Sequence, residues 1–273
     1  MEIHLWKEFL EPYELTVREL VTRFRQIKKG YRIRGEYCPI EDVSGRVKSV
    51  PSILAKAQRK GIPIERVGEE MNDIAGIRII CQFVEDIPLV TALIRDQLEM
   101  EILDERDYVT RMKDSGYRSY HMIASYDAHT LDGIKKVRAE IQIRTLGMDF
   151  WATIEHGLQY KYNSGIPEHI FDKLISSAKA IEDLDGELSA VRNDIMDAQN
   201  SMIMYNEMIS EILSTIENLY RIANVREVEK IQNEFYRIYE TGDTEQMRRF
   251  GRELDMIAEG YRAQSVETDE KKI

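Results

Sequence analysis

The chain has 273 residues, 43% of them hydrophobic and 32% charged, a composition typical of a soluble globular protein with one large domain or two smaller ones. No apolar run approaches the ~20 residues of a membrane span, and the N-terminal segment lacks the regions of a secretion signal. The net charge of −11 argues against a protein that coats nucleic acid, but it leaves room for a local basic cleft. Cys38 and Cys81 show no metal-binding spacing, so we expect reduced thiols and a cytoplasmic location. Because no apolar run is long enough to span a membrane, we expect no membrane partner.

Residues 6–31 are predicted to form a helix whose apolar side chains recur at alternating spacings of four and three. The members of this seam are Trp6, Leu10, Tyr13, Val17, Leu20, Phe24, Ile27 and Tyr31. A heptad pattern favours a partner helix, so residues 1–35 are predicted to be an N-terminal oligomerisation helix. Packing of the seam against the chain's own core explains the pattern equally well. Basic residues follow on the exposed side, among them Arg25 and Lys28.

Residues 45–61 are predicted to form a loop followed by a helix, with Ser49 as the N-cap and Gly61 as the C-terminal stop. One stripe of side chains spaced by four begins at the helix N-terminus. It consists of Lys48, Ser52, Lys56 and Lys60. Aligned ammonium groups at a helix N-terminus suit a polyphosphate. A lysine-rich face turned to solvent is the simpler interpretation, and it stays open.

Residues 72–84 show the alternation of a β-strand, with apolar side chains on one face and Arg78 on the other. Asp73 precedes the strand, and residues 86–99 follow it as an amphipathic helix.

A loop and a second strand are predicted at residues 107–126, where Tyr117, Ser119 and His121 share one face. Because helices alternate with strands, we expect an α/β or α+β domain over residues 36–165.

Residues 137–144 alternate strictly, with apolar residues on one face and a polar row that includes Glu140 and Gln142 on the other. Such a row is typical of a face that floors an active site, although a solvent-exposed sheet face with an Arg–Glu pair gives the same pattern. Thr145 then begins an amphipathic helix. Its predicted buried stripe is Phe150, Trp151, Ile154 and Leu158.

Residues 166–263 are predicted to be a helical extension with a heptad rhythm over residues 170–219. A break or hairpin is expected near Asn200–Ser201, because one unbroken helix would be roughly 80 Å long. Further helices meet at Thr241–Gly242–Asp243, where a C-cap glycine is followed by an N-cap aspartate. The polar tail of residues 264–273 is expected to be disordered.

The polar residues on the predicted strand faces and the lysine stripe form one candidate constellation. It contains the carboxylates Asp73 and Glu140, the cations Arg46, Lys48, Lys56 and Arg78 with Ser52 among them, and the side chains Tyr117, His121 and Gln142. Two carboxylates amid positive charge fit a Mg²⁺ site for phosphoryl-type transfer, which relies mostly on positioning and charge neutralisation. The Walker A glycine loop and the kinase motifs are absent from the sequence.

Four segments resemble the synthetase motifs of the RelA/SpoT family: GRVKSVPSILAKAQRKG, DIAGIRIICQF, DSGYRSYH and EIQIRTLGMDFWATIEH. The resemblance covers about residues 5–190 and is strongest to single-domain small alarmone synthetases, which are GTP pyrophosphokinases. It implies a nucleotidyltransferase-like mixed β-sheet flanked by helices. It also implies transfer of the β,γ-pyrophosphoryl group of ATP to the 3′-hydroxyl of GDP or GTP, giving AMP and the stringent-response alarmones ppGpp or pppGpp.

The resemblance also implies a role for each matching residue. Arg46 and Arg78 would enclose the adenine, and Lys48, Ser52 and Lys56 would hold the ATP phosphates. Asp73 and Glu140 would bind Mg²⁺, with Glu140 also accepting the hydroxyl proton. Tyr117 would stack on guanine, while Lys113, His121 and Gln142 would contact the acceptor nucleotide.

Relatives of this kind form homotetramers, so the resemblance implies the same assembly here, with pppGpp or RNA as a regulator. Some relatives bind pppGpp in a central cleft, in regions where this chain has Asp42 and Asp149. Because negative charge opposes a polyphosphate, we expect little activation even though Arg25 and Lys28 are retained.

Two other functions remain open at this point. A non-catalytic nucleotide- or RNA-binding regulator could use the same scaffold, although it would gain nothing from two carboxylates in a basic cleft. A nucleotidyltransferase would move AMP and release pyrophosphate, whereas a pyrophosphokinase releases AMP.

Overall fold

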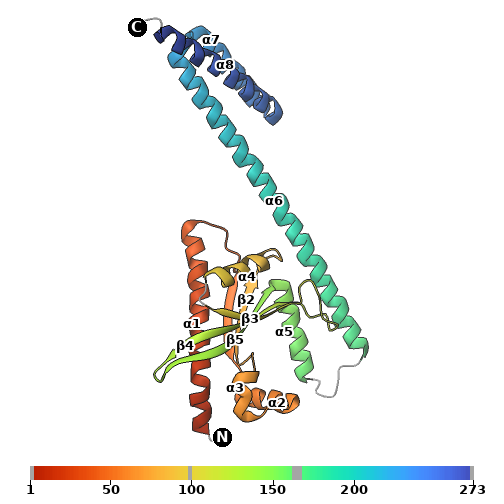
Figure 1. Ribbon diagram of the computed structural model, residues 1–273. Helices are drawn as coiled ribbons and strands as arrows, with labels where there is room; N and C mark the ends of the chain where they lie inside the picture. The colour runs from red at the N-terminus through yellow and green to blue at the C-terminus, as the bar shows by residue number, and fades with distance from the viewer. Residues whose placement is uncertain (1–2, 98–99, 162–167, 271–273) are drawn as a thin grey trace. The chain divides into compact units, whose positions relative to one another are not determined.

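The computed structural model describes residues 3–97, 100–161 and 168–270 of the chain. It divides into two compact units, Met1–Val191 and Arg192–Ile273, which we treat separately. The first unit is built on a five-stranded mixed sheet in the order β1-β2-β5-β4-β3 (Figure 1). The strands are β1 (Asp42–Val47), β2 (Ala75–Cys81), β3 (Glu101–Asp107), β4 (Tyr120–Thr130) and β5 (Gly133–Thr145). The predicted fold class, a mixed sheet flanked by helices with helices after it, is confirmed.

The two strands predicted from alternation, β2 and β5, lie side by side and run parallel, and the other strand pairs are antiparallel. Their register places Ile77 opposite Ile141 and Ile79 opposite Ile143, and all four side chains are buried. The intervening residues of both strands face the other side of the sheet. One face of the sheet is therefore apolar and the other carries the polar rows.

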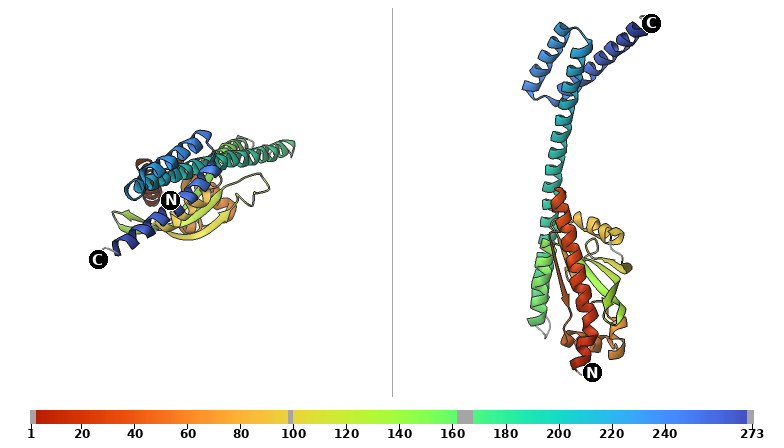
Figure 2. Two further views of the ribbon diagram at one scale, coloured as in Figure 1. Left: turned by 90° about the horizontal axis from the view of Figure 1, so that it is seen from above. Right: turned by 90° about the vertical axis from the view of Figure 1, so that its left-hand side faces the viewer.

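The helices α1 (Ile3–Arg34) and α4 (Asp86–Gln97) contribute to the core on the apolar face, and Figure 2 shows α1 running alongside the sheet. Leu20 and Phe24 are completely buried there, and the other seam residues pack around them. The seam thus packs against the protein's own sheet, as the alternative interpretation expected, and the role of residues 1–35 in oligomerisation stays a prediction. Pro12 is accommodated inside α1.

The segment after α1 differs from the prediction in one respect. Residues 45–47, expected to belong to a loop, are the end of the edge strand β1, which pairs with β2. The helix α2 (Val50–Lys60) begins and ends as predicted, with Ser49 as the N-cap and Gly61 in the left-handed conformation at φ 66°. A 3₁₀ turn (Ile64–Arg66) and α3 (Val67–Glu70) then lead into the loop that carries Asp73.

The helix α5 (Leu146–Lys161) follows β5 directly and packs against the first part of α6 (Glu168–Ile222). Trp151 is buried there, and its indole N–H donates to the carbonyl of Leu174 and to Ser177, both at 3.1 Å. The predicted buried stripe is wrong in two places: Phe150 is 64% and Ile154 is 43% exposed. Neither side chain belongs to the cluster that Trp151 forms with Leu174 and Ala178.

Residues 168–191 belong to the first unit, so that unit extends beyond the boundary predicted at residue 165. The reason is side-chain contact: Thr145 donates to Asp185 at 2.9 Å, and Ser189 donates to Glu85 at 2.7 Å.

The second unit combines the end of α6 with α7 (Val225–Thr241) and α8 (Thr244–Glu270) around a separate core. The break expected near Asn200–Ser201 is wrong, since α6 is continuous and the Ser201 hydroxyl bonds within it to the Asp197 carbonyl. The turn at Gly242 and the N-cap Asp243 form as predicted. The expected disordered tail is helical as far as Glu270.

A close approach between α1 and β1 gives the first testable prediction. A Cβ atom on Gly45 would lie 2.7 Å from a methyl group of Val17 and 2.8 Å from one of Val21. Gly45→Ala should therefore lower the free energy of unfolding by about 1–3 kcal/mol, as overpacking does. Urea unfolding followed by circular dichroism measures the change.

The matched control is Gly30→Ala in α1, where the nearest atom to an added Cβ lies 3.9 Å away. Alanine favours a helix over glycine by roughly 0.5–1 kcal/mol, so this variant should be as stable as the unaltered protein or more so. Equal losses from both substitutions would contradict the close-packing argument.

Candidate functional site

The polar face of the sheet brings side chains from four strands into one row. In register, Arg46 lies opposite Gly76, which lies opposite Glu140, while Arg78 lies opposite Gln142. The same row continues to His121, the strand partner of Gln142. Because Gly76 has no side chain, space remains between its neighbours. The row therefore opens into a pocket.

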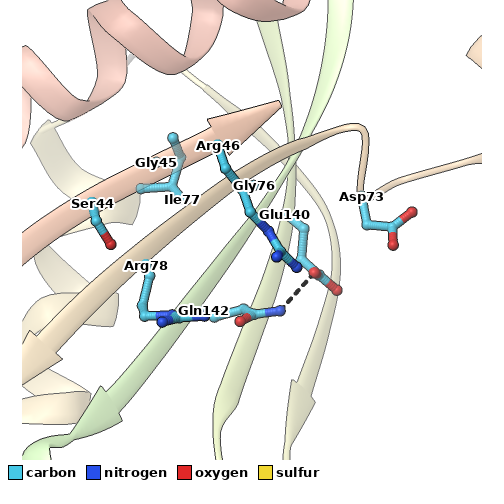
Figure 3. A pocket seen from close by; sticks show the side chains of 9 residues that line it. All are labelled: Ser44, Gly45, Arg46, Asp73, Gly76, Ile77, Arg78, Glu140 and Gln142. Carbon is cyan, nitrogen blue, oxygen red and sulfur yellow. Dashed lines mark hydrogen bonds between the residues drawn. The ribbon is translucent and has the colours of Figure 1, made fainter. Parts of the chain in front are cut away.

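This first pocket has a volume of about 290 Å³ (Figure 3). It is lined by Ser44, Gly45, Arg46, Asp73, Gly76, Ile77, Arg78, Glu140 and Gln142. A second pocket of about 120 Å³ adjoins it and is lined partly by Lys56, Lys60, Arg106 and His121. Asp73 and Glu140 line both pockets. The two carboxylates therefore lie where the pockets meet.

Two lysines converge on Asp73 from the predicted stripe. The Nζ atoms of Lys48 and Lys56 lie 2.7 Å and 2.5 Å from the same carboxylate oxygen, Oδ2. Burial acts to raise the pKa of Asp73, but the hydrogen bonds from both lysines outweigh it and hold that pKa below its usual value. The stripe is therefore a structured cluster around an ionised carboxylate, and the interpretation as a plain solvent face is wrong for Lys48 and Lys56.

The other oxygen of Asp73, Oδ1, is buried and has no hydrogen-bond partner among the described residues. A buried carboxylate oxygen without a donor is costly unless a cation or another donor reaches it. Oxygen ligands of this kind suit Mg²⁺, so the pair Asp73 and Glu140 fits the predicted metal.

Glu140 belongs to a closed ring of hydrogen bonds made by five side chains. The ring runs from Tyr117 Oη to His121 Nε2 (2.8 Å), from His121 Nδ1 to Glu140 Oε1 (3.2 Å), and from Gln142 Nε2 to Glu140 Oε2 (2.8 Å). Arg144 closes it by donating to Gln142 Oε1 at 2.9 Å and to Tyr117 Oη at 2.5 Å.

The donors in this ring lead from Arg144 to Glu140 along two arms, one through Tyr117 and His121 and the other through Gln142. Since Arg144 donates to the Tyr117 hydroxyl, that hydroxyl is left to donate to His121 Nε2, and we assign the His121 proton to Nδ1, facing Glu140. Burial acts to raise the pKa of Glu140, but the hydrogen bonds from His121 and Gln142 keep it lowered. Glu140 is therefore an ionised acceptor.

The loop that carries Tyr117 is shaped by a tight turn. Gly116 has φ +90°, and a Cβ there would lie 2.7 Å from Ala178 and 3.1 Å from Trp151. This turn presents Lys113 to the aromatic side chains, with its Nζ 4.2 Å from the ring centre of Tyr108 and 4.8 Å from that of Tyr117. Burial raises the pKa of Tyr117, so its hydroxyl stays protonated.

Most predicted site residues are brought together, with one at the margin. Ser52 is exposed on α2, where its hydroxyl contacts that of Ser49 at 2.9 Å, and it lines neither pocket. The structure adds Lys60, Asp104 and Arg106 to the second pocket. Asp104 and Arg106 lie on β3, a strand that sequence reasoning missed because the charged run EILDERD lacks clear apolar alternation.

Sequence reasoning placed Arg144 on the polar strand face but gave it no role, and it missed the partners of Asp149. Asp149 Oδ1 lies 3.2 Å from both Arg78 NH1 and Arg144 NH1. Its charge is therefore balanced by two guanidinium groups inside the site, and its effect on binding of pppGpp in a central cleft stays a prediction. Arg144 is buried and joins Asp149 to the hydrogen-bonded ring.

Among the described residues, no helix combines the length and apolar character needed to cross a membrane.

Comparisons with known proteins agree with this geometry. Residues 45–165 match the family model described as the region found in RelA / SpoT proteins. The chain is 46% identical over 199 residues to GTP pyrophosphokinase YjbM of Bacillus subtilis, covering 73% of this chain and 94% of that protein. It is 36% identical over 192 residues to GTP pyrophosphokinase YwaC of the same organism, covering 70% and 91%.

Among solved structures, the small alarmone synthetase 1 of Bacillus subtilis bound to its product pppGpp superposes with a TM-score of 0.68 at 46% identity. The match covers 70% of this chain and 98% of that one. The chain therefore belongs to the RelA/SpoT family. Within that family it is similar to the small alarmone synthetases.

Proposed function

We propose that this protein is a Mg²⁺-dependent GTP pyrophosphokinase, which transfers the β,γ-pyrophosphoryl group of ATP to the 3′-hydroxyl of GDP or GTP. The products are AMP and ppGpp or pppGpp. The observation that carries the proposal is the position of Asp73 and Glu140, which line both of two adjoining pockets. Two substrates that bind one in each pocket would meet at these carboxylates, where a pyrophosphoryl group can pass between them.

The first pocket is the donor side in this proposal. Arg46 and Arg78 line it from adjacent strands, and flat guanidinium groups stack well on a base such as adenine. Lys48 and Lys56 lie beside it on Asp73, where their ammonium groups can contact the ATP phosphates, with Ser52 on the same helix. Positive charge here neutralises the charge of the transferred group.

Asp73 and Glu140 would hold Mg²⁺, which supplies further charge neutralisation when it is bound. Within the described part of the chain, Asp73 Oδ1 has no hydrogen-bond partner that a metal would have to displace, whereas Oδ2 is held by two lysines. When the phosphates draw the lysines away from Oδ2, that oxygen also becomes accessible. The two lysines thus keep the Asp73 carboxylate ionised until the nucleotide binds.

The acceptor nucleotide would enter the second pocket beside His121 and extend across Tyr117 and Lys113, which lie next to that pocket. Gln142 lines the first pocket and would contact the acceptor from that side of Glu140. Stacking of guanine on Tyr117 uses a ring whose orientation is fixed because its hydroxyl accepts from Arg144 and donates to His121. Glu140 is ionised, so it can accept the proton of the 3′-hydroxyl as that oxygen attacks the β-phosphorus and the bond to the α-phosphate breaks. We place this reaction in the cytoplasm, which suits the free thiols Cys38 and Cys81.

Product analysis tests the proposal directly. Purified protein with ATP, Mg²⁺ and GDP or GTP should release AMP, whereas a nucleotidyltransferase would release pyrophosphate and a non-catalytic regulator neither. Glu140→Gln removes the negative charge and the proton acceptor while keeping the side-chain shape. It should therefore lower the rate roughly 10²-fold or more, as lost catalytic contacts do.

The matched control is Glu101→Gln at the start of β3, where the side chain is exposed and lines neither pocket. This variant should retain the rate of the unaltered protein. Near-normal turnover by Glu140→Gln would remove Glu140 from the chemistry.

A second prediction separates the ring of Tyr117 from its hydroxyl. Base stacking on an aromatic side chain contributes ~1–3 kcal/mol, so Tyr117→Ala should raise the KM for the guanine nucleotide roughly tenfold or more. Tyr117→Phe keeps the ring but loses the bonds to His121 and Arg144, so its effect should be intermediate. Steady-state kinetics with GDP measures both. Equal KM values for Phe and Ala would assign the effect to the hydroxyl alone.

We also propose that the protein assembles as a homotetramer through α5 rather than through the seam of α1. Leu146, Phe150 and Ile154 follow one another at helical spacing and are 55%, 64% and 43% exposed, an apolar stripe that a second copy would cover. Phe150→Glu should then reduce the mass measured by light scattering, while Leu131→Glu at the exposed hairpin tip should not. An unchanged mass for Phe150→Glu would exclude this interface.

Regulation by pppGpp is a separate part of the proposal. Arg25 donates to the Val43 carbonyl at 3.0 Å, and Lys28 bonds to the Glu41 carbonyl, so both cations are engaged within the chain. Asp42 is exposed beside them. These contacts favour weak activation by pppGpp.

A further inference from the structure

The two nucleotide pockets are joined by a chain of charged and hydrogen-bonded side chains. Arg78 lines the first pocket, and its NH1 lies 3.2 Å from Asp149 Oδ1. The same oxygen lies 3.2 Å from Arg144 NH1, and Arg144 NH2 donates to the Tyr117 hydroxyl at 2.5 Å. The contacts therefore run without interruption from the proposed donor base site to the proposed acceptor base site.

The members of this chain differ in how firmly they are held. The Arg144 side chain is 5% exposed, and its donors are spent on Ser119, Asp149, Gln142 and Tyr117. The Arg78 side chain is 34% exposed, and its buried Nε has no hydrogen-bond partner among the described residues. Arg144 is thus fixed, whereas Arg78 is restrained mainly by Asp149.

We infer that Asp149 and Arg144 are positioning residues that couple the two nucleotide sites, so that occupancy of the ATP site raises the affinity for GDP or GTP. This inference rests on the proposed function, because it uses the donor and acceptor assignments of Arg78 and Tyr117. It assigns no contact with substrate to Asp149 or Arg144. Their role is indirect: when one nucleotide binds and makes the side chains of its own site more rigid, these two residues make the side chains of the other site more rigid as well.

The direction of the coupling follows from burial. A base stacked on Arg78 excludes water from the Arg78–Asp149 pair, and an ion pair is stronger where water is excluded. Asp149 then holds Arg144 more firmly, and Arg144 in turn holds the Tyr117 hydroxyl. Because the acceptor site is already ordered, the second nucleotide loses less entropy when it binds. Linkage requires the effect to be reciprocal.

Removal of the Asp149 carboxylate would reverse this arrangement. Arg78 and Arg144 would then be two neighbouring positive charges without the anion between them, and they would repel each other. Arg78 would lose its connection to the hydrogen-bonded ring, while the ring itself, from Tyr117 through Glu140 to Arg144, would keep its own bonds. Each site could still bind its nucleotide, but without influence on the other.

The test is a pair of calorimetric titrations of GDP with Mg²⁺, without and with a saturating ATP analogue that has a methylene bridge between the α- and β-phosphates. This analogue cannot transfer its pyrophosphoryl group. In the unaltered protein it should raise the affinity for GDP about fivefold or more, the low end of typical coupling between sites. In Asp149→Ala that factor should fall below about twofold. The affinity for GDP alone should be retained, since the removed charge is negative.

Asp132→Ala is the matched control, because it removes the same charge from a side chain that is 80% exposed. It should keep the full coupling factor. Asp149→Asn, which loses the charge but keeps the shape, should repeat the result of Asp149→Ala and replaces it if that variant does not fold. Undiminished coupling in the Asp149 variants, or none in the unaltered protein, would overturn the inference. Failure of the unaltered protein to bind either nucleotide would instead overturn the proposed function.

Discussion

The parallel pairing of β2 with β5 is the constraint on which the rest of the first unit depends. Its register puts Ile77 beside Ile141 on one face and Gly76 beside Glu140 on the other. A shift by one residue would exchange the two faces of the shifted strand and turn its polar row toward the core. The helix α1 can bury the apolar face only in this register. The core and the site are thus specified by the same pairing.

Local sequence signals predicted much of this arrangement. The alternation in β2 and β5 identified the polar row, and Ser49 with Gly61 marked the ends of α2, because these features depend on neighbours a few residues away. What covers the seam of α1 could not be predicted in the same way. A heptad pattern shows that a surface must be buried, whereas the identity of its partner is decided by contacts distant in sequence.

The same distinction applies to the site. Asp73, Glu140 and Tyr117 could be named because they lie in recognisable motifs, and the structure brings them together. The partners of Asp149 were missed because these two guanidinium groups come from β2 and β5, and only the folded chain shows that Asp149 balances them. The strand β3 was missed because its charged residues lie at the sheet edge, where alternation between core and solvent is weak.

That edge position has a consequence for the behaviour of the protein in concentrated solution. Edge strands offer free backbone groups to strands of other molecules and so favour aggregation. On β1, Arg25 occupies the carbonyl of Val43, and on β3 an irregularity between Ile102 and Asp104 interrupts a strand in which five of the seven residues, EILDERD, are charged. Both edges of the sheet are therefore poor templates for further pairing, which protects the open sheet against fibre-like growth.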